Sequence, residues 1–235
     1  MGNRIEKRVT YLDSIETVTT THYVRDASGN VMGVYVDSMA TELYIYGSSR
    51  LGLYAGGRYN GQRSLGEKRY ELTNHLGNVL AVISDNIGMN TSDSVWATVV
   101  SATDYYPFGL EMEGRIWSDT TATYRHAFNG KEKDDNGVWG NVAYGYGFRI
   151  YDPVIARFKS TDPLAKSYPM LTPYQFASNM PIVAIDLDGL EAMIAIYGGG
   201  VTDGRSDQPQ FKKEAAQDVA RGLAKGQARG VFNCR

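Results

Sequence analysis

The sequence predicts a mainly β fold built of antiparallel hairpins, and three observations support this prediction. Seventeen tyrosines stand against seven phenylalanines, and tyrosine favours half-buried pleated surfaces, where its ring packs and its hydroxyl stays wet. Twenty-six glycines with only seven prolines favour many short strands joined by tight turns. A recurring unit, in which a tyrosine-containing strand leads through a Gly-Asn turn into an apolar strand, is typical of a β-hairpin.

The first residues, 1–21, are polar and rich in threonine, and they predict a connector with one edge strand at Arg8–Leu12. Residues 22–143 then predict a series of hairpins. The two clearest units pair a polar strand with an apolar one across a Gly-Asn turn, and they are His22–Asp26 with Val31–Tyr35, and Tyr70–Leu72 with Val79–Ile83. Because each unit buries its face only against neighbours, this self-similarity predicts stacked hairpins in a long curling sheet.

The remainder of this region is less regular. Glu42–Tyr46 alternates like a strand, Tyr54–Gly66 is glycine-rich and predicts a loop, and Val95–Tyr106 predicts a further strand pair. Ile116–Asn136 predicts a polar hairpin excursion that turns at Asn129-Gly130. The tyrosines and Gly-Asn steps of these hairpins are interpreted as architecture, without a chemical role.

Residues 144–190 predict a compact, sharply turned plug. The segment contains two Asp-Pro steps, Asp152-Pro153 and Asp162-Pro163, and it closes on Asp188-Gly189. Proline fixes one backbone dihedral, glycine supplies positive φ, and aspartate bonds its own backbone, so such steps form turns. A chain that turns this often forms neither a long helix nor a plain strand.

The composition changes after Leu190, which predicts a boundary there and a separate C-terminal region at 191–235. Met193–Tyr197 predicts one apolar strand. Phe211–Ala228 predicts a short helical tail, because its apolar residues recur every four positions on one face.

Bulk composition excludes several classes of function. A net charge of −2 indicates no nucleic-acid or membrane-surface partner, and no apolar run approaches the roughly 20 residues of a membrane helix. The lone Cys234 excludes a disulfide within the chain, and neither it nor the three histidines have metal-ligand spacing. The start shows no signal peptide. The sequence predicts no metal and no cofactor.

An ordered series of short motifs runs from about residue 20 to residue 191. In chain order the motifs are Asn74–Asn78, Asp104–Gly109, Arg149–Pro153, Arg157-Phe158, Ser160–Leu164, Pro173-Tyr174, Asn179, Pro181 and Ile185–Leu190. In this order they resemble the RHS repeat-associated core domain, the closing part of the YD-repeat (Rhs) shell of polymorphic toxins. The resemblance implies that 22–143 are YD-repeat-like hairpins, that 144–190 close the shell, and that 191–235 begin a variable, toxin-like or effector-like region.

The family cuts itself after the closing motif, through two aspartates that resemble an aspartic protease dyad. Carried onto this sequence, the resemblance implies Asp162 and Asp186 as the catalytic pair and Leu190–Glu191 as the cleaved bond. Two carboxylates held close together cannot both ionise cheaply, so one keeps its proton. The ionised member can then take a proton from water while the protonated one polarises the peptide carbonyl.

Three further residues are expected to support this pair. Arg157 precedes the first aspartate and can orient a carboxylate through a forked hydrogen bond. Arg149 and Arg157 are both expected in buried ion pairs that close the shell rather than in direct catalysis, and Asp188 rivals Asp186 for the second position of the dyad. Leu187 stands where the family usually has proline.

Two functions therefore stay open. In the first, the chain is the terminal part of an encapsulating shell and releases a C-terminal toxin as a single-turnover aspartic autoprotease. The resemblance then implies the upstream repeats of the shell and an immunity protein as partners, and export or the cell surface as its setting. In the alternative, which Leu187 favours, the chain is a non-catalytic β scaffold or adhesion module, or a degenerate gene fragment.

Overall fold

The structure is a computed structural model that describes residues 4–11, 17–55, 65–91, 94–119, 124–134, 142–190 and 192–194. The chain divides into two compact units. The first comprises Met1–Thr73, Val79–Asp104 and Glu113–Tyr124, and the second comprises Asn74–Asn78, Tyr105–Met112 and Arg125–Arg235. The second unit therefore combines the predicted plug with three segments of the predicted hairpin region, 74–78, 105–112 and 125–143.

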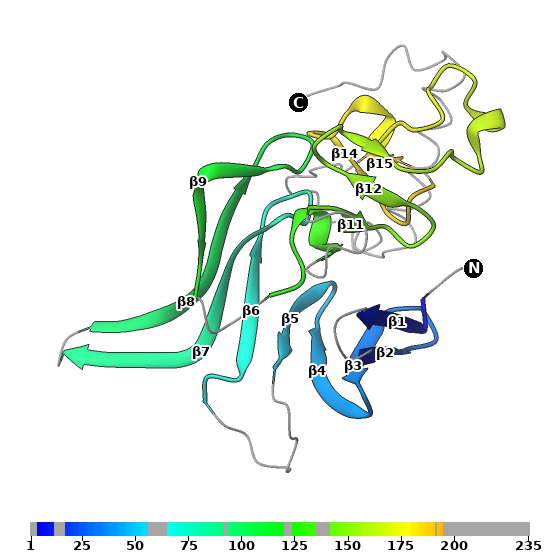
Figure 1. The fold of residues 1–235 in the computed structure, drawn as a ribbon. Coiled ribbons are helices and arrows are strands. Elements are labelled where there is room, and N and C mark those ends of the chain that lie inside the picture. Colours follow the sequence, from blue (N-terminus) through cyan, green and yellow to red (C-terminus); the bar gives the residue numbers. More distant parts are fainter. Residues whose placement is uncertain are drawn as a thin grey trace, which may run out of the picture. The chain divides into compact units, whose positions relative to one another are not determined.

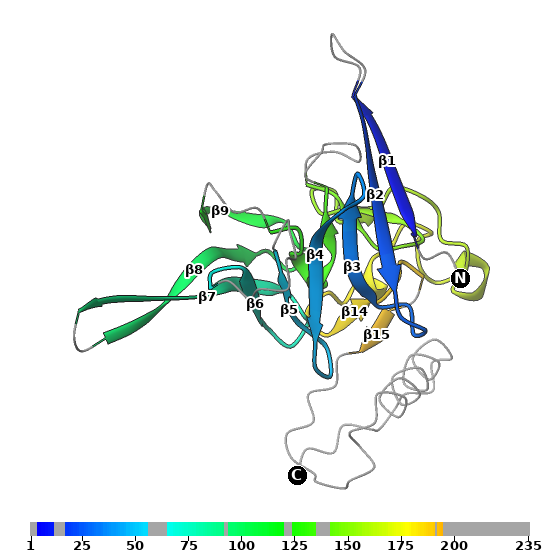
Figure 2. The same cartoon turned by 90° about the horizontal axis from the view of Figure 1, so that it is seen from below.

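A nine-stranded sheet contains the predicted hairpins, and its strands follow one another in chain order (Figure 1). The strands are β1 (Glu6–Tyr11), β2 (Thr17–Arg25), β3 (Val31–Val36), β4 (Met39–Tyr46), β5 (Arg50–Tyr54), β6 (Lys68–Thr73), β7 (Val79–Thr91), β8 (Ser94–Tyr105) and β9 (Glu111–Ser118). Pairing from β1 to β8 is antiparallel throughout. The edge strand β1 lies along β2 (Figure 2), so the mainly β, antiparallel fold and the predicted edge strand are confirmed.

Alternation along the strands decides which side chains enter the core of the first unit. In β2, Tyr23 is buried whereas His22 and Val24 are exposed, as successive side chains point to opposite faces. Two apolar clusters result, one formed by Tyr23, Val34, Tyr44 and Leu53 and one formed by Val79, Val82 and Val100.

Four loops share one five-residue form, and they are Asp26–Asn30, Asn74–Asn78, Tyr106–Leu110 and Ala127–Lys131. In each, the N–H of the first residue donates to the carbonyl of the fifth, and the N–H of the fourth, a glycine with φ of 65° to 90°, donates back to the carbonyl of the first. A three-residue hairpin loop with a left-handed glycine has this pattern, and in Ala127–Lys131 the residue before the glycine, Asn129, is left-handed as well, with a φ of 48°. The Oδ1 atoms of Asp26 and Asn74 also accept amides two and four residues onward, at 2.8–3.0 Å. The Gly-Asn turns are therefore confirmed.

The plug in the second unit consists of short strands and turns. Its strands are β10 (Glu132–Lys133), β11 (Tyr144–Gly145), β12 (Ile150–Asp152) and β13 (Arg157–Phe158), which form one sheet, and β14 (Ala184–Asp186) with β15 (Ala192–Ile194), which form another. Three single 3₁₀ turns occur at Phe128–Gly130, Ala165–Ser167 and Ala177–Asn179. No α-helix occurs among the residues that the structure describes, as the frequent turn chemistry predicts.

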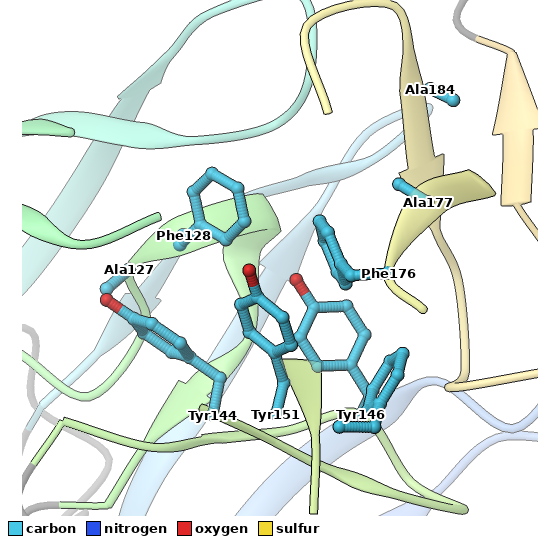
Figure 3. Close-up of a cluster of buried hydrophobic side chains, with 9 residues drawn as sticks. Ala127, Phe128, Tyr144, Tyr146, Tyr151, Phe176, Ala177 and Ala184 are labelled. Carbon is cyan, nitrogen blue, oxygen red and sulfur yellow. The ribbon is translucent and has the colours of Figure 1, made fainter. Parts of the chain in front are cut away.

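An aromatic core holds this unit together (Figure 3). Its buried members are Ala127, Phe128, Tyr144, Tyr146, Tyr151, Phe158, Phe176, Ala177 and Ala184. The rings of Tyr151 and Phe176 stack with centroids 4.1 Å apart, and Tyr146 meets Phe158 edge-on at 5.6 Å. Such pairs add about 0.5–1.5 kcal/mol each beyond the burial of their area. The Tyr151 hydroxyl donates to the Phe108 carbonyl at 2.8 Å, which ties the Tyr106–Leu110 loop to the plug.

Two sequence predictions about strands are wrong. Val95–Tyr106 is not a strand pair, because β8 is a single strand that lies between β7 and β9 in the sheet. The segment contains no glycine or proline that could reverse the chain. Ile116–Ser118 belongs to β9 rather than to a hairpin excursion, although the predicted turn at Asn129-Gly130 is confirmed.

Other predictions fall partly or wholly outside the described residues. The predicted strand Met193–Tyr197 corresponds to β15 only as far as Ile194. Most of the predicted loop Tyr54–Gly66 and the whole predicted helix Phe211–Ala228 lie outside the described ranges.

Candidate functional site

The side chain at the centre of the plug is Arg149. It ends a two-residue turn between β11 and β12, in which the Tyr146 N–H donates to the Arg149 carbonyl at 3.1 Å and Gly147 has a φ of 95°. The guanidinium is buried and lies over the Phe158 ring, 3.8 Å from its centroid. Its Nη1 donates to the Pro173 carbonyl at 3.3 Å. Burial lowers the pKa of Arg149, and the neighbouring carboxylates oppose that shift.

Asp162 is positioned by the turn that its own sequence forms. Its Oδ1 accepts the Leu164 N–H at 2.8 Å, the local bond expected of an aspartate before proline. Its backbone N–H donates to the Pro173 carbonyl at 2.8 Å. The other oxygen, Oδ2, forms a buried ion pair with Arg149 Nη2 at 3.1 Å.

Asp186 is the last residue of β14 and is 1% exposed. Its Oδ1 accepts the Gly189 N–H at 2.6 Å. Its Oδ2 lies 3.8 Å from Arg149 Nη2 and accepts no hydrogen bond from any described residue. Burial raises the pKa of Asp186 to about 6, although the Gly189 N–H, Arg149 and Lys131 act in the opposite direction.

The two predicted dyad residues thus lie beside one guanidinium nitrogen. Because Asp162 Oδ2 and Asp186 Oδ2 are 3.1 Å and 3.8 Å from the same atom, they can be no farther apart than the sum of these distances. Asp162 is ion-paired, whereas Asp186 has a raised pKa and an oxygen without a donor. Two carboxyl groups whose environments differ in this way are suited to hold one proton between them.

The remaining predicted residues lie differently. Arg157 is exposed in β13, where the adjacent Phe158 is buried, because neighbouring residues of a strand point to opposite sides. Within the described ranges, no hydrogen bond or ion pair joins Arg157 to either aspartate, and the guanidinium beside both is that of Arg149. Asp188 is exposed, and its carbonyl accepts the Phe148 N–H at 3.0 Å.

Leu190 is half-buried, and Glu191 lies outside the described residues. Since Asp186 pairs with Ala192 across β14 and β15, Leu190 lies in the short hairpin loop that follows Asp186.

Lys131 is the residue at this site that the sequence did not indicate. Its Nζ donates to the Leu187 carbonyl and lies 5.0 Å from the centroid of the Tyr146 ring. Its only local signal is its place directly after the Asn129-Gly130 turn, which says nothing about a partner 56 positions onward.

A second buried ion pair lies in the first unit. Arg50 Nε is 2.8 Å from Glu71 Oε1, and the Tyr124 hydroxyl donates to the same oxygen at 2.5 Å. Burial raises the pKa of Tyr124. This cluster presents one carboxylate to two donors, an arrangement that stabilises the sheet.

In the part of the chain that the structure describes, no three His, Cys, Asp or Glu side chains gather closely enough to hold a metal ion. None of its helices has the length and apolar composition needed to span a bilayer.

No family model matches the chain. Salivary gland surface protein 1 of Aedes aegypti is 28% identical over 98% of this chain and 7% of the relative. Toxin subunit YenC1 of Yersinia entomophaga is 36% identical over 39% of this chain and 9% of the relative. The chain therefore spans less than a tenth of the length of these relatives.

Two solved structures extend the comparison to the fold. The match to the structure of TcdB2-TccC3 covers 80% of this chain and 9% of the TcdB2-TccC3 chain, with a TM-score of 0.55 and 21% sequence identity. The structure of TcdB2-TccC3 without its hypervariable C-terminal region covers 80% of this chain, with a TM-score of 0.53 and 22% identity. The chain thus shares its fold with a segment of TcdB2-TccC3.

Proposed function

We propose that the chain is a segment of an Rhs-type encapsulating shell, and that residues 144–190 form its RHS core closing part. The shared fold with TcdB2-TccC3 and the partial identity to YenC1 support the proposal. Because the chain spans only a small share of these proteins, its partners are the remaining repeats of a longer shell, with an immunity protein as a further partner. Export follows from a role in such a toxin complex.

Within that shell, the function that the site supports best is a single self-cleavage after Leu190, which releases residues 191–235 and whatever follows them. The observation that carries this proposal is the buried Arg149 nitrogen beside both Asp162 and Asp186. The site therefore contains one ion-paired carboxylate, that of Asp162, and one carboxyl group, that of Asp186, that retains its proton up to a pH of about 6.

The reaction is a peptide hydrolysis. Water attacks the carbonyl carbon of Leu190 while Asp162 accepts one of its protons, and protonated Asp186 donates a hydrogen bond to the carbonyl oxygen. The bond to the nitrogen of Glu191 then breaks, and that nitrogen leaves as an amine after taking up a proton. The products are a carboxylate at Leu190 and a new N-terminus at Glu191.

The test uses the full chain with a different tag at each end. Intact mass spectrometry should find a parent product that ends at Leu190, and Asp162→Asn and Asp186→Asn should abolish it. The matched control is Asp188→Asn, an exposed carboxylate in the same loop, which should cut like the parent. A parent that stays uncut over days at about pH 5 to 6, where the raised pKa of Asp186 favours the protonated form, contradicts the proposal.

A non-catalytic surface scaffold is the second candidate. The relative that covers 98% of this chain is named a surface protein. Moreover, one guanidinium beside two carboxyl groups can also close a fold without any reaction, since its charge compensates that of one ionised carboxylate. An intact parent in the test above would favour this candidate.

A further inference from the structure

The hairpin loop that follows Asp186 is held along three consecutive carbonyls by donors from outside the loop. The pairs are Leu187 O with Lys131 Nζ, Asp188 O with Phe148 N–H at 3.0 Å, and Gly189 O with Arg149 Nε. The Gly189 N–H is also held, by Asp186 Oδ1. The loop backbone is thus attached residue by residue up to the one before Leu190.

Lys131 is the member of this set that no catalytic role explains. Phe148 contributes only its backbone, and Arg149 already contacts both carboxylates. Lys131 instead reaches the loop from another part of the chain, and its ammonium contacts the first of the three carbonyls.

The position of the Lys131 ammonium is set by rigid surroundings. Its backbone closes the Ala127–Lys131 loop through the Ala127 N–H, at 3.0 Å, and its ammonium lies over the Tyr146 ring. Tyr146 is buried in the aromatic core, and its hydroxyl donates to Asn129 Oδ1 at 2.8 Å. A cation over an aromatic face loses much of the freedom of its flexible stem. The ammonium therefore marks a defined point against which the loop can be aligned.

Alignment matters because hydrolysis requires near-attack geometry, and a misplacement of about 1 Å can reduce a rate roughly 100-fold. In a short loop, a slip by one residue would present a different peptide bond to the same two carboxyl groups. We propose that Lys131 is a positioning residue that holds the loop in register through the Leu187 carbonyl and so selects the bond after Leu190. The selection of the bond rests on the proposed self-cleavage, whereas the holding of the loop does not.

Because Lys131 is charged, replacing it should change the pH profile of cleavage. A purely steric role of its side chain would leave that profile unchanged. The groups that act on Asp186 are the Gly189 N–H, Arg149 and Lys131, which lower its pKa, and Asp188, which raises it. The phenol of Tyr146 faces it as a neutral group. Removing the lysine charge should therefore shift the pH profile of cleavage to higher pH.

The first experiment measures the loop itself, by amide hydrogen exchange of the full chain. Lys131→Met keeps the length and apolar stem of the side chain but removes its donor and charge. The Gly189 and Phe148 amides should then exchange roughly 2- to 10-fold faster, the factor that corresponds to the loss of one solvent-exposed hydrogen bond. Lys131→Arg should restore protection. The matched control is Lys159→Met, which removes a partly exposed lysine paired with Asp152.

The second experiment follows cleavage of the same variants by intact mass. Lys131→Met should cut more slowly than the parent, at more than one bond, and with its pH profile moved upward. Lys131→Arg should cut after Leu190 as the parent does.

The outcomes separate the two proposals. Unchanged exchange at both amides in Lys131→Met overturns the positioning role whether or not the parent cuts. Faster exchange in a chain whose parent never cuts supports the holding of the loop and contradicts self-cleavage. Faster exchange with an unchanged rate, bond and pH profile of cleavage overturns the selection of the bond.

Discussion

Asp186 is the buried carboxyl group whose charge state should make the stability of this protein depend on pH. Burial raises its pKa from the ordinary value of 3.8 to about 6. A folded-state pKa above the unfolded one means that the folded chain binds this proton more tightly. The stabilisation is therefore fully present below pH 3.8 and is lost as the pH rises through about 6. Asp186→Asn keeps the oxygen that accepts the Gly189 N–H but cannot ionise.

The magnitude follows from the shift. It spans about two pKa units, each equivalent to about 1.36 kcal/mol, so the ionised carboxylate lowers the free energy of unfolding by roughly 3 kcal/mol. Most of this loss develops between about pH 4 and about pH 7. Over that range, the free energy of unfolding of Asp186→Asn should rise by about 2 to 3 kcal/mol relative to that of the parent.

The assay is urea unfolding at a series of pH values, with each chain first shown to be uncut by intact mass. Asp188→Asn is the matched control, because it removes an exposed carboxylate two residues away whose effect on the pKa of Asp186 is the smallest of those that act on it, and its difference from the parent should change far less with pH. A constant difference between Asp186→Asn and the parent across the same range would refute the reasoning. It would mean that Asp186 titrates in the folded chain as it does in the unfolded one.

Two further predictions concern packing. Gly189→Ala should lower the free energy of unfolding by about 2 to 3 kcal/mol. The reason is that Gly189 has a φ of 86° and that the Cβ of an alanine there would lie 3.1 Å from the backbone nitrogen of Arg149. Gly114→Ala, with a φ of 76° but nothing within 4 Å of the new Cβ, should lose only about 1 kcal/mol of backbone strain; equal losses in urea unfolding would contradict the packing argument. Phe128→Ala removes a ring that is 1% exposed and should lower the free energy of unfolding by about 3 to 5 kcal/mol. Trp117→Ala removes one that is 52% exposed and should change it by less than about 1 kcal/mol, so similar effects of the two would argue against the aromatic core.

The elements that the sequence predicted well are those decided by a few consecutive residues. The turns at Gly29-Asn30 and Gly77-Asn78 are confirmed, because a left-handed glycine and an Asp or Asn three residues before it suffice to close each loop. The turn at Asp162 is local in the same sense, since its Oδ1 binds the amide two residues onward.

The predictions that failed or missed required knowledge of distant partners. Val95–Tyr106 reads as apolar strand sequence, but nothing in it shows that its partner is β7. Arg149 and Arg157 are similar by sequence, yet only Arg149 lies beside the carboxylates, because Arg157 follows the alternation of β13 to the exposed side. Nothing in the local sequence indicated that Lys131 belongs to the site, since the residue that it contacts, Leu187, is 56 positions away.

The order of strands and turns, and the presence of two aspartates in a tightly turned segment, were thus determined by the sequence alone, because turn chemistry and side-chain alternation act over a few residues. Only the tertiary structure decided which cation lies beside both Asp162 and Asp186, and that burial raises the pKa of Asp186. The physical reason is that desolvation and ion pairing depend on every group that the fold brings around a side chain, and those groups come from distant parts of the chain.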